Sequence, residues 1–597
     1  MAWALGCHLR RPGSAACAAV GVAACCGGGI AGSSCSTSIS SGIPAISNLL
    51  AALQHPRPDC RGSGRPYSSA AAWGGASRDG GLVPALPSGS TTGHPSMRAQ
   101  LVRDFIHDSL YHPSEGYFTK HTAFGAGVVG SLQQPLDFAS MDGQVEYLQA
   151  VQRVYRELQA SWLTPVEILQ PHYGRAIANC ILQRWQEQTA DALAAGDAEP
   201  PLLIYEVGGG TGTLARNMLD WLRTEHPSAY RRTRYSCIEI SPVLAALQRR
   251  KLAAGGHAER FSVRQHDAAD LAAWRRADEA ARSSSGSGGG MGDSASSSSS
   301  SCAASSGSEG GAGEHAFIVM CEVLDNLPHD RVWRDMGSSE WQQTLVAEGD
   351  PHGDLADWAQ HHRQGGGGAL IELLQPASDP LIRRCLQAMH AADSSADSSS
   401  RKTGLALSAA RAWRRLVGEA TEEVRWLPTG CLQLLDTLRQ ARLSHTLIAA
   451  DFDQLPEVVI AGVNAPLVAS TYGGSTHDHG SYLVPRGTAD IFFPTDFQLL
   501  CTLYRQAAAT AAGGRPTSSS SSSSHAAALQ PIASAEHMPT PDFMLRYAPD
   551  PSATRTLSGY NPLLEDYSNT AFFVGSCLWQ RAAGAASSGN GGSGAAR

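Results

Sequence analysis

The stretch EVGGGTGTLARNML, Glu206 to Leu219, decides the fold of this chain. Four glycines fall within five consecutive positions behind an acidic residue, and Leu214, Met218 and Leu219 then follow at helical spacing. The preceding run PLLIYE (201–206) is short, apolar and rich in residues that favour strands. The pattern predicts a buried strand, a glycine loop and a helix, in that order.

Three further runs repeat the strand pattern downstream. They are YSCIEIS (235–241), RFSVRQHD (260–267) and AFIVMCE (316–322). After the first of them, Ser241 is placed to cap a helix whose first residue is Pro242. Strands that alternate with helical segments predict an α/β fold, with a parallel sheet covered by helices on both faces. In such sheets ligands bind beyond the carboxyl ends of the strands.

The register of the glycines separates two classes of cofactor. A dinucleotide fingerprint, GxGxxG, needs a third glycine where this chain has Thr213, so a dinucleotide oxidoreductase is the weakest interpretation. The pattern instead resembles motif I of class I S-adenosylmethionine-dependent methyltransferases. The methionine end of that cofactor carries an ammonium and a carboxylate group, so its site needs an acidic acceptor as well as bare backbone amides. We therefore expect S-adenosyl-L-methionine to bind at Glu206, Gly208, Gly210 and Gly212.

Two more acids follow the next strands, where the rest of such a cofactor would lie. Glu239 ends the second strand, and a carboxylate there can accept hydrogen bonds from both ribose hydroxyls. Asp267 ends the third strand, where it can accept from the adenine amino group. We predict that both bind the cofactor. The alternatives are a helix-capping role for Glu239 and a solvated surface position for Asp267.

Several longer phrases resemble the MidA-like family, the mitochondrial arginine methyltransferases that assist assembly of respiratory complex I. They are SEGYF (114–118), TPVEILQPHYG (164–174), EVGGGTGTL (206–214), IEISPVL (238–244), CEVLDNLPHD (321–330) and GTADIFFPTDF (487–497). The resemblance covers roughly residues 98 to 576. It implies a Rossmann-like class I methyltransferase core with a helical N-terminal region and inserted substrate-side elements.

The same resemblance carries expectations about the reaction. It implies transfer of methyl groups to an arginine of a complex I core subunit, giving symmetric dimethylarginine, and it is compatible with a homodimer. Glu167, in the TPVE phrase, is then expected to contact the cofactor or the substrate; the alternative is a role at the N-terminus of a helix.

The chain also departs from the family pattern. About 45 residues separate SEGYF from TPVE, where the better-known members have a short link. Gly209 stands where those members often have proline, and LIAADFDQLP (447–456) occupies the place of their strand ending in Asp-Tyr-Gly. These departures indicate a divergent eukaryotic branch, in which cofactor binding carries over more safely than the substrate.

Glu322 and Asp325 are the candidate catalytic residues, because they lie in CEVLDNLP at the end of the fourth strand, close to the expected place of the methyl group. A guanidinium stays protonated at neutral pH and its lone pair is delocalised, so carboxylates are needed to orient it and to concentrate electron density on the attacking nitrogen. Which of the two is catalytic stays open. The alternative is that Asp325 and Asn326 only form the turn before Pro328.

Composition limits the other classes of function. A net charge of −8 over 597 residues gives no sign of affinity for nucleic acid. The 14 cysteines show no CxxC pair and no Cys/His spacing typical of zinc or of a disulfide framework, so we expect free thiols and no metal. No run is long and apolar enough to predict a transmembrane helix.

Residues 1–67 have the composition of a transit peptide. The first 58 residues contain no Asp or Glu and are rich in Ala, Ser, Gly and Cys, and Arg65 to Ser68 resemble a mitochondrial processing pattern. We predict cleavage near Tyr67 and delivery to the mitochondrial matrix, with the chloroplast as second choice.

The remaining chain divides at Gly/Ser-rich tracts that cannot bury a core. We predict a linker (68–96), an N-terminal helical region (97–200), a methyltransferase core (201–504) with low-complexity insertions (283–314, 364–368 and 393–400), a low-complexity loop (505–540), a C-terminal part of the core (541–580) and a disordered tail (581–597).

Two other functions stay open at this point. One is an assembly scaffold that keeps the fold and binds an assembly intermediate without methylating it. The other is a methyltransferase acting on another nitrogen acceptor. The intact glycine motif and Glu239 favour an enzyme.

Overall fold

The computed structural model describes most of the chain after residue 98, and the described residues fall within one compact unit. They are residues 99–119, 130–158, 163–196, 198–286, 314–335, 338–348, 370–399, 422–472, 475–509 and 529–581. The predicted transit peptide, the linker and the 364–368 insertion lie outside these residues, as does the tail after Arg581.

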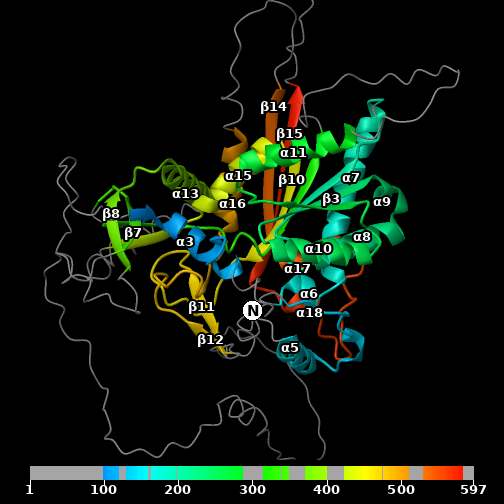
Figure 1. Ribbon diagram of the computed structural model, residues 1–597, viewed down its shortest axis with the longest axis horizontal. Helices are drawn as coiled ribbons and strands as arrows, with labels where there is room; N and C mark the ends of the chain where they lie inside the picture. Colours follow the sequence, from blue (N-terminus) through cyan, green and yellow to red (C-terminus); the bar gives the residue numbers. More distant parts are fainter. Residues whose placement is uncertain are drawn as a thin grey trace, which may run out of the picture. The chain divides into compact units, whose positions relative to one another are not determined.

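A seven-stranded sheet forms the centre of the fold (Figure 1). Its strands, in spatial order, are β14 (Leu529–Pro539), β15 (Thr570–Arg581), β10 (His445–Phe452), β5 (Ala316–Cys321), β2 (Leu202–Val207), β3 (Thr233–Glu239) and β4 (Phe261–Gln265). The five strands from β10 to β4 are parallel, and β15 and β14 continue the sheet antiparallel. The four predicted strands and their parallel arrangement are thus confirmed.

Side chains alternate between the two faces of this sheet, as the period of a strand requires. Ile204 of β2 packs into one hydrophobic cluster, whereas Leu203 and Tyr205 pack into a second cluster on the opposite face. The first face is covered by α7 (His172–Ala194), α8 (Thr213–Glu225) and α17 (Thr540–Tyr547). The second is covered by α11 (Leu271–Gly286), α13 (Pro380–Ser399), α15 (Thr429–Ala441) and α16 (Phe497–Ala509). Both faces of the sheet are therefore buried.

The chain before the sheet contributes both a strand and helices. These elements are β1 (Ala99–Leu101), α3 (Val102–Tyr111), the 3-10 helix η1 (Phe138–Ser140), α5 (Gln144–Leu158), α6 (Pro165–Ile168) and α7. Thr164 caps α6 by accepting a hydrogen bond from the Glu167 amide, and Pro165 occupies the first helical position. The short strand β1 leaves this region and pairs with β7 of a second sheet.

Two smaller sheets are inserted after β5. One joins β1 to β7 (Gln342–Glu348), β6 (Asp330–Asp335) and β9 (Glu422–Leu427), with β8 (Leu370–Pro376) paired to β7. The other has the order β12 (Ser475–Asp478), β11 (Leu467–Tyr472), β13 (Asp490–Phe492). The remaining helices are α9 (Pro227–Arg232), α10 (Pro242–Ala254) and α18 (Pro562–Glu565). Ser241 caps α10 by accepting from the Leu244 amide, as predicted.

The low-complexity assignments are wrong in three places. Residues 283–286 end α11, residues 393–399 continue α13, and the predicted loop 505–540 begins with the last turn of α16 and ends in β14. The run LQPIASAEHMP shows no strand pattern of its own, but it pairs with β15 along its whole length. Long-range pairing therefore overrides weak local preference here. Residues 287–313 and 510–528 lie outside the described part of the chain.

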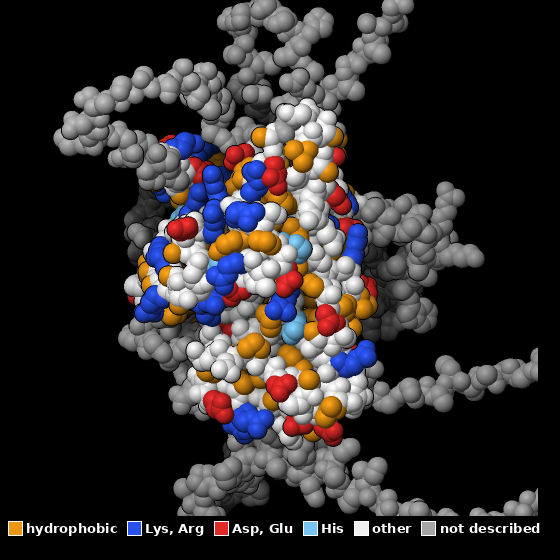
Figure 2. Space-filling view, turned by 90° about the vertical axis from the view of Figure 1, so that its right-hand side faces the viewer, with side chains coloured by type: hydrophobic (Ala, Val, Ile, Leu, Met, Phe, Trp, Pro, Cys, Tyr) orange, Lys and Arg blue, Asp and Glu red, His pale blue; other side chains and the backbone are white. Residues whose placement is uncertain are grey.

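The surface offers fewer clues than the interior. On the face that Figure 2 turns toward the viewer, basic, acidic and apolar side chains are intermingled. Among the helices of the described residues, none is long and apolar enough to cross a membrane.

Candidate functional site

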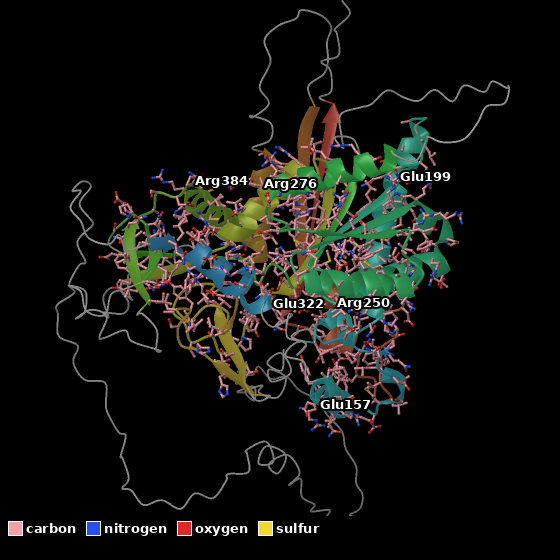
Figure 3. All side chains as sticks on the ribbon, viewed as in Figure 1. Glu157, Glu199, Arg250, Arg276, Glu322 and Arg384 are labelled. Carbon is pink, nitrogen blue, oxygen red and sulfur yellow. The ribbon has the colours of Figure 1, made fainter. Side chains whose placement is uncertain are left out.

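A cavity of about 560 Å³ opens at the carboxyl ends of β2, β3, β4, β5 and β10. The chain order reverses between β2 and β5, which is the point where ligands bind in open α/β sheets. Figure 3 places Glu322 there, at the end of the sheet between α3 and α10. Six predicted site residues line the cavity: Gly208, Gly210, Glu239, Asp267, Glu322 and Asp325.

The glycine loop has a backbone that other residues rarely adopt. Gly208, Gly210 and Gly212 have φ values of +69°, +50° and +85°. A side chain at Gly208 would meet Val323 at 2.9 Å, whereas the space beside Gly210 is open toward the cavity. Gly212 instead caps α8 and lies against Leu252, so its role is to let α8 and α10 pack closely. The first two glycines leave bare backbone at the cavity wall.

Glu239 lies at the end of β3 and reaches the same wall. One carboxylate oxygen accepts from the Ser241 amide at 2.9 Å, and the other accepts from Gln248 Nε2 at 2.9 Å. Gln248 also donates to the Gly210 carbonyl at 3.0 Å, which joins this acid to the glycine loop. Burial raises the pKa of Glu239 to about 7, in spite of these hydrogen bonds. The helix-capping alternative is therefore part of its role, because the Ser241 amide is one of its donors.

Asp267 lies two residues beyond β4 and pairs with α3. His107 Nε2 is 3.6 Å from one oxygen, and the Ala269 amide donates to the other at 2.8 Å. Burial alone would raise the pKa of Asp267, but the hydrogen bonds from His107 and Ala269 outweigh it and lower that pKa. The same pair raises the pKa of His107. Asp267 is thus a paired acid at the edge of the cavity, and sequence reasoning missed His107, which lies far away in the chain.

Glu206 and Glu167 do not line the cavity. Glu206 is buried behind the glycine loop, where it accepts from Tyr235 Oη at 2.8 Å and from Cys237 Sγ at 3.3 Å. Glu167 accepts from the hydroxyls of Thr211 and Thr213, each at 2.5 Å. Both donors to Glu206 reach one oxygen, Oε2, whereas Glu167 accepts both threonine hydroxyls at its Oε1. Contact of these two acids with the cofactor stays a prediction.

Glu167 is the centre of a buried polar cluster under the loop. Its second oxygen accepts from the Leu132 amide at 3.1 Å, and Lys251 Nζ lies 4.0 Å from the first. Lys251 also donates to Ser131 Oγ at 2.8 Å. The cluster therefore ties the segment before α5 to the glycine loop and to α10.

Glu322 follows β5 in an unusual backbone conformation. Its φ is +53°, a region that costs a non-glycine residue energy and is concentrated at functional sites. Its amide donates to the Ala450 carbonyl at 2.9 Å, but among the described residues its carboxylate has no hydrogen-bond or ion-pair partner. Burial and the neighbouring Asp325 raise the pKa of Glu322 well above its ordinary value.

Asp325 faces the same cavity from the following turn. Its Oδ1 is buried without a hydrogen-bond partner in the described structure. Burial raises the pKa of Asp325 to about 7. The turn predicted as the alternative also exists, with the Leu327 amide donating to the Leu324 carbonyl at 3.3 Å. The residue is thus part of the turn and of the cavity wall at once.

Two further acids lie near this end of the cavity, and neither was among the candidate site residues of the sequence analysis. Asp490 of β13 is buried, lines the cavity and accepts from Asn326 Nδ2 at 3.0 Å. Burial and Asp325 raise its pKa to about 8. Asp451 is the last residue but one of β10 and lies behind the turn, outside the cavity lining. An acid inside the apolar run DIFF was the one available signal for Asp490.

The charged groups of the lining are mostly acidic. The acids are Asp104, Glu239, Asp267, Glu322, Asp325 and Asp490. The basic groups are Arg103, His107 and His266. Arg103 is engaged, because it pairs with Asp330 and Asp379 at 2.7 Å each. The end of the cavity near Glu322 therefore suits a positively charged ligand. Within the described ranges no group of three His, Cys, Asp or Glu side chains could hold a metal ion.

Comparison with known proteins agrees with this geometry. Residues 176–514 match the model of a family described as "Putative S-adenosyl-L-methionine-dependent methyltransferase", which is more than half of the chain. No curated protein matches the sequence significantly.

Solved structures resemble the chain only distantly. A protein from Burkholderia thailandensis crystallised with S-adenosyl-homocysteine has 16% identity and a TM-score of 0.43, over 80% of this chain and 88% of its own. A native structure of an uncharacterised protein of the same superfamily and organism has 14% identity and a TM-score of 0.41, over 80% of this chain and 87% of its own. The CcbJ methyltransferase from Streptomyces caelestis has 11% identity and a TM-score of 0.25, over 75% of this chain and 100% of its own.

The cavity fits the cofactor of the matched family. Gly208 and Gly210 leave backbone free at its wall, and a Cβ at Gly208 would already be too close to Val323. Glu239 presents a carboxylate at the next strand end, where ribose hydroxyls can donate to it. S-adenosyl-L-methionine is the cofactor of this chain, and binding of it by Gly208, Gly210 and Glu239 stays a prediction that this geometry allows.

Proposed function

Since the chain belongs to this family of S-adenosyl-L-methionine-dependent methyltransferases, we propose that it is a class I enzyme that methylates a protein arginine. The observation that carries the proposal is the pair of acids after β5. Asp325 Oδ1 is buried without a partner, and the carboxylate of Glu322 has none among the described residues. Buried carboxylates without partners are costly unless a ligand completes them.

An arginine side chain would complete this site well. Its guanidinium is always protonated and offers five N–H donors in a plane, which suits two carboxylates at different angles. Glu322 and Asp325 orient the guanidinium and draw its positive charge toward one nitrogen, so that the other becomes more nucleophilic. Asp490 and Asn326 lie beside them and limit how the ligand can turn.

The cofactor, when bound, supplies the electrophilic methyl group, and the chain supplies position and charge. The glycine loop and Glu239 hold the cofactor on one side of the cavity, and the acids after β5 hold the acceptor on the other. The methylated nitrogen sheds one proton. Asp325 and Asp490 can hold this proton, because burial raises their pKa values to about 7 and about 8.

The biological setting is part of the proposal. We propose the MidA-type role in a divergent eukaryotic branch, with symmetric dimethylation of an arginine in a core subunit of complex I during assembly. The mitochondrial matrix is the proposed compartment, with the chloroplast as second choice, on the basis of the composition of residues 1–67. A homodimer is compatible with this role. The CEVLDNLPHD and GTADIFFPTDF phrases support it, since both contribute acids to the cavity.

A non-catalytic scaffold and an enzyme for another nitrogen acceptor are the competing proposals. The test is incubation of the purified chain with methyl-labelled S-adenosyl-L-methionine and isolated complex I core subunits, followed by peptide mass spectrometry. Label on an arginine side chain supports the proposal. Label on lysine or histidine would favour the other acceptor class, and absence of label with intact cofactor binding would favour the scaffold.

A further inference from the structure

The carboxylate of Asp451, in β10, lies behind the acceptor site and binds the backbone of the turn that carries it. We propose that Asp451 is a positioning residue that sets where Glu322 and Asp325 point. The inference rests on the proposed acceptor role of those two acids. Asp451 does not line the cavity.

The contacts of Asp451 are all to backbone amides. One oxygen accepts from Leu324 N at 2.8 Å and from Asp325 N at 3.2 Å. The other accepts from Phe452 N at 2.8 Å. The residue is 2% exposed, and no basic side chain pairs with it in the described part of the chain. A buried carboxylate without a cation is costly, so these amides are the groups that stabilise it.

The turn that Asp451 holds is strained and needs support at both ends. Glu322 has a φ of +53°, and its amide is tied to the Ala450 carbonyl at 2.9 Å. Two residues later Asp451 binds the amides of Leu324 and Asp325. Two consecutive residues of β10, Ala450 and Asp451, therefore accept hydrogen bonds from the start and the end of the turn. Strained backbone persists only where its surroundings over-determine it.

The turn is fixed from the opposite side as well. The Asp325 carbonyl accepts from the Phe493 amide at 2.8 Å, and Asn326 Nδ2 donates to the Ile491 carbonyl at 3.2 Å. With these contacts in place, loss of Asp451 would tilt the turn rather than unfold the sheet. The direction of the Glu322 and Asp325 carboxylates would then change, while the glycine loop on β2 and Glu239 on β3 would keep their contacts.

Two substitutions separate position from charge. Asp451→Asn offers one acceptor oxygen, which can serve either Phe452 N or the pair of amides in the turn, but not both. Asp451→Glu keeps the charge and moves the carboxylate by one methylene. A positioning role predicts that both variants are impaired, whereas a purely electrostatic role predicts that only the first is. Asp453→Asn is the matched control, because Asp453 follows on the same segment and makes no contact with the turn.

The experiment uses the full chain saturated with S-adenosylhomocysteine. Calorimetric titration compares a short peptide containing one arginine with the same peptide containing citrulline, which is neutral and nearly isosteric. Hydrogen exchange followed by mass spectrometry reports on the amides of residues 322–325. Titration of S-adenosylmethionine and a melting curve show whether each variant is folded.

We expect wild type and Asp453→Asn to bind the arginine peptide and not the citrulline peptide. Both Asp451 variants should keep cofactor affinity within about twofold, lose at least about tenfold in arginine affinity and exchange faster at residues 322–325. Wild-type binding to arginine with unchanged binding in either Asp451 variant would overturn the positioning role. A wild type that does not distinguish the two peptides contradicts the proposed acceptor instead, and unchanged exchange in the variants would then overturn the inference about Asp451.

Discussion

Two groups of acids lie on opposite sides of the cavity, and they differ in their partners. Under the glycine loop, Glu167 accepts from protein donors at both oxygens, and Glu206 accepts from two donors at Oε2. After β5, Asp325 Oδ1 and the Glu322 carboxylate have no such donor among the described residues. Both groups consist of acidic side chains, so residue type alone does not identify a ligand-binding acid. We propose that the first group maintains the shape of the cofactor side and that the second group binds the cationic acceptor.

Gly210→Val tests the assumption behind this comparison, which is that the cofactor lies between the two groups of acids. A β-branched residue is strained at a φ of +50°, and its side chain would enter the space beside the loop. We expect a loss of affinity for S-adenosylmethionine of more than about 1,000-fold and no measurable turnover, with the sheet still folded by circular dichroism. Binding that stays within tenfold of wild type would refute the assignment of the loop.

Glu322→Gln and Asp325→Asn test the acceptor side directly. Each keeps the shape and removes the charge, so turnover should fall by roughly 100- to 1,000-fold while cofactor affinity stays within about twofold. The free energy of unfolding should not decrease, because burial already disfavours the charged form of both carboxyl groups and Asp325 Oδ1 has no partner to lose. Turnover assays, calorimetry and urea denaturation measure the three quantities. Normal turnover in Asp325→Asn would return that residue to a turn-forming role alone.

Glu167→Gln tests whether the first group of acids stabilises the glycine loop. The amide cannot replace the carboxylate toward both threonine hydroxyls and the Leu132 amide, so we expect a loss of about 1–3 kcal/mol in the free energy of unfolding. Affinity for S-adenosylmethionine should fall by roughly tenfold, because Thr211 and Thr213 end the glycine loop. Urea denaturation and calorimetry check this, with Glu187→Gln on the exposed side of α7 as control. A Glu167 variant as stable as the control would mean that its carboxylate does not maintain the loop.

The buried acid Asp490, beside the second group, should also affect the pH dependence of stability. Burial raises the pKa of Asp490 to about 8, so the folded chain binds its proton more tightly than the unfolded chain does. The free energy of unfolding should therefore fall as pH rises from about 4 to about 8, by up to about 1.4 kcal/mol per pH unit from this group. Asp490→Asn should flatten that decline in urea denaturation at pH 5.5 and 8. An identical slope in wild type and variant would argue against the raised pKa of Asp490.

The smallest effect is expected at the edge of the cavity. His107→Asn removes the partner of Asp267, whose side chain is 42% exposed, so screening by water limits the consequence. We expect a change of about two- to fivefold in the KM for S-adenosylmethionine and none in kcat at saturation, measured by steady-state kinetics. A fall in kcat would connect α3 to the chemical step.

Much of the fold was predictable because its signals are local. The β2 strand, the glycine turn and the Ser241 cap depend on residues that are neighbours in the chain. The strand β14 was not predictable, since its pairing with β15 joins segments without a strong pattern. The five-stranded sheet, built from β1 and from strands inserted more than 200 residues later, was not foreseen for the same reason.

The sequence predicts at which strand ends the site residues lie, but it does not predict their side-chain partners. Order along the chain places Gly208, Glu239, Asp267 and Glu322 at one edge of a parallel sheet. It does not reveal that the hydroxyls of Thr211 and Thr213 donate hydrogen bonds to Glu167, or that β13 places Asp490 at the cavity. Such contacts depend on side chains that meet only after the inserted elements have folded back onto the core.

The most direct test of the central claim is the identity of the methylated atom. Purified complex I core subunits would be incubated with the full chain and S-adenosylmethionine carrying a deuterated methyl group, and the products would be mapped by tandem mass spectrometry beside a Glu322→Gln control. We predict label on the terminal nitrogens of an arginine, and its loss in the control. Label on another residue type, or equal arginine label with the Glu322→Gln variant, would contradict the claim that the acids after β5 bind the acceptor guanidinium.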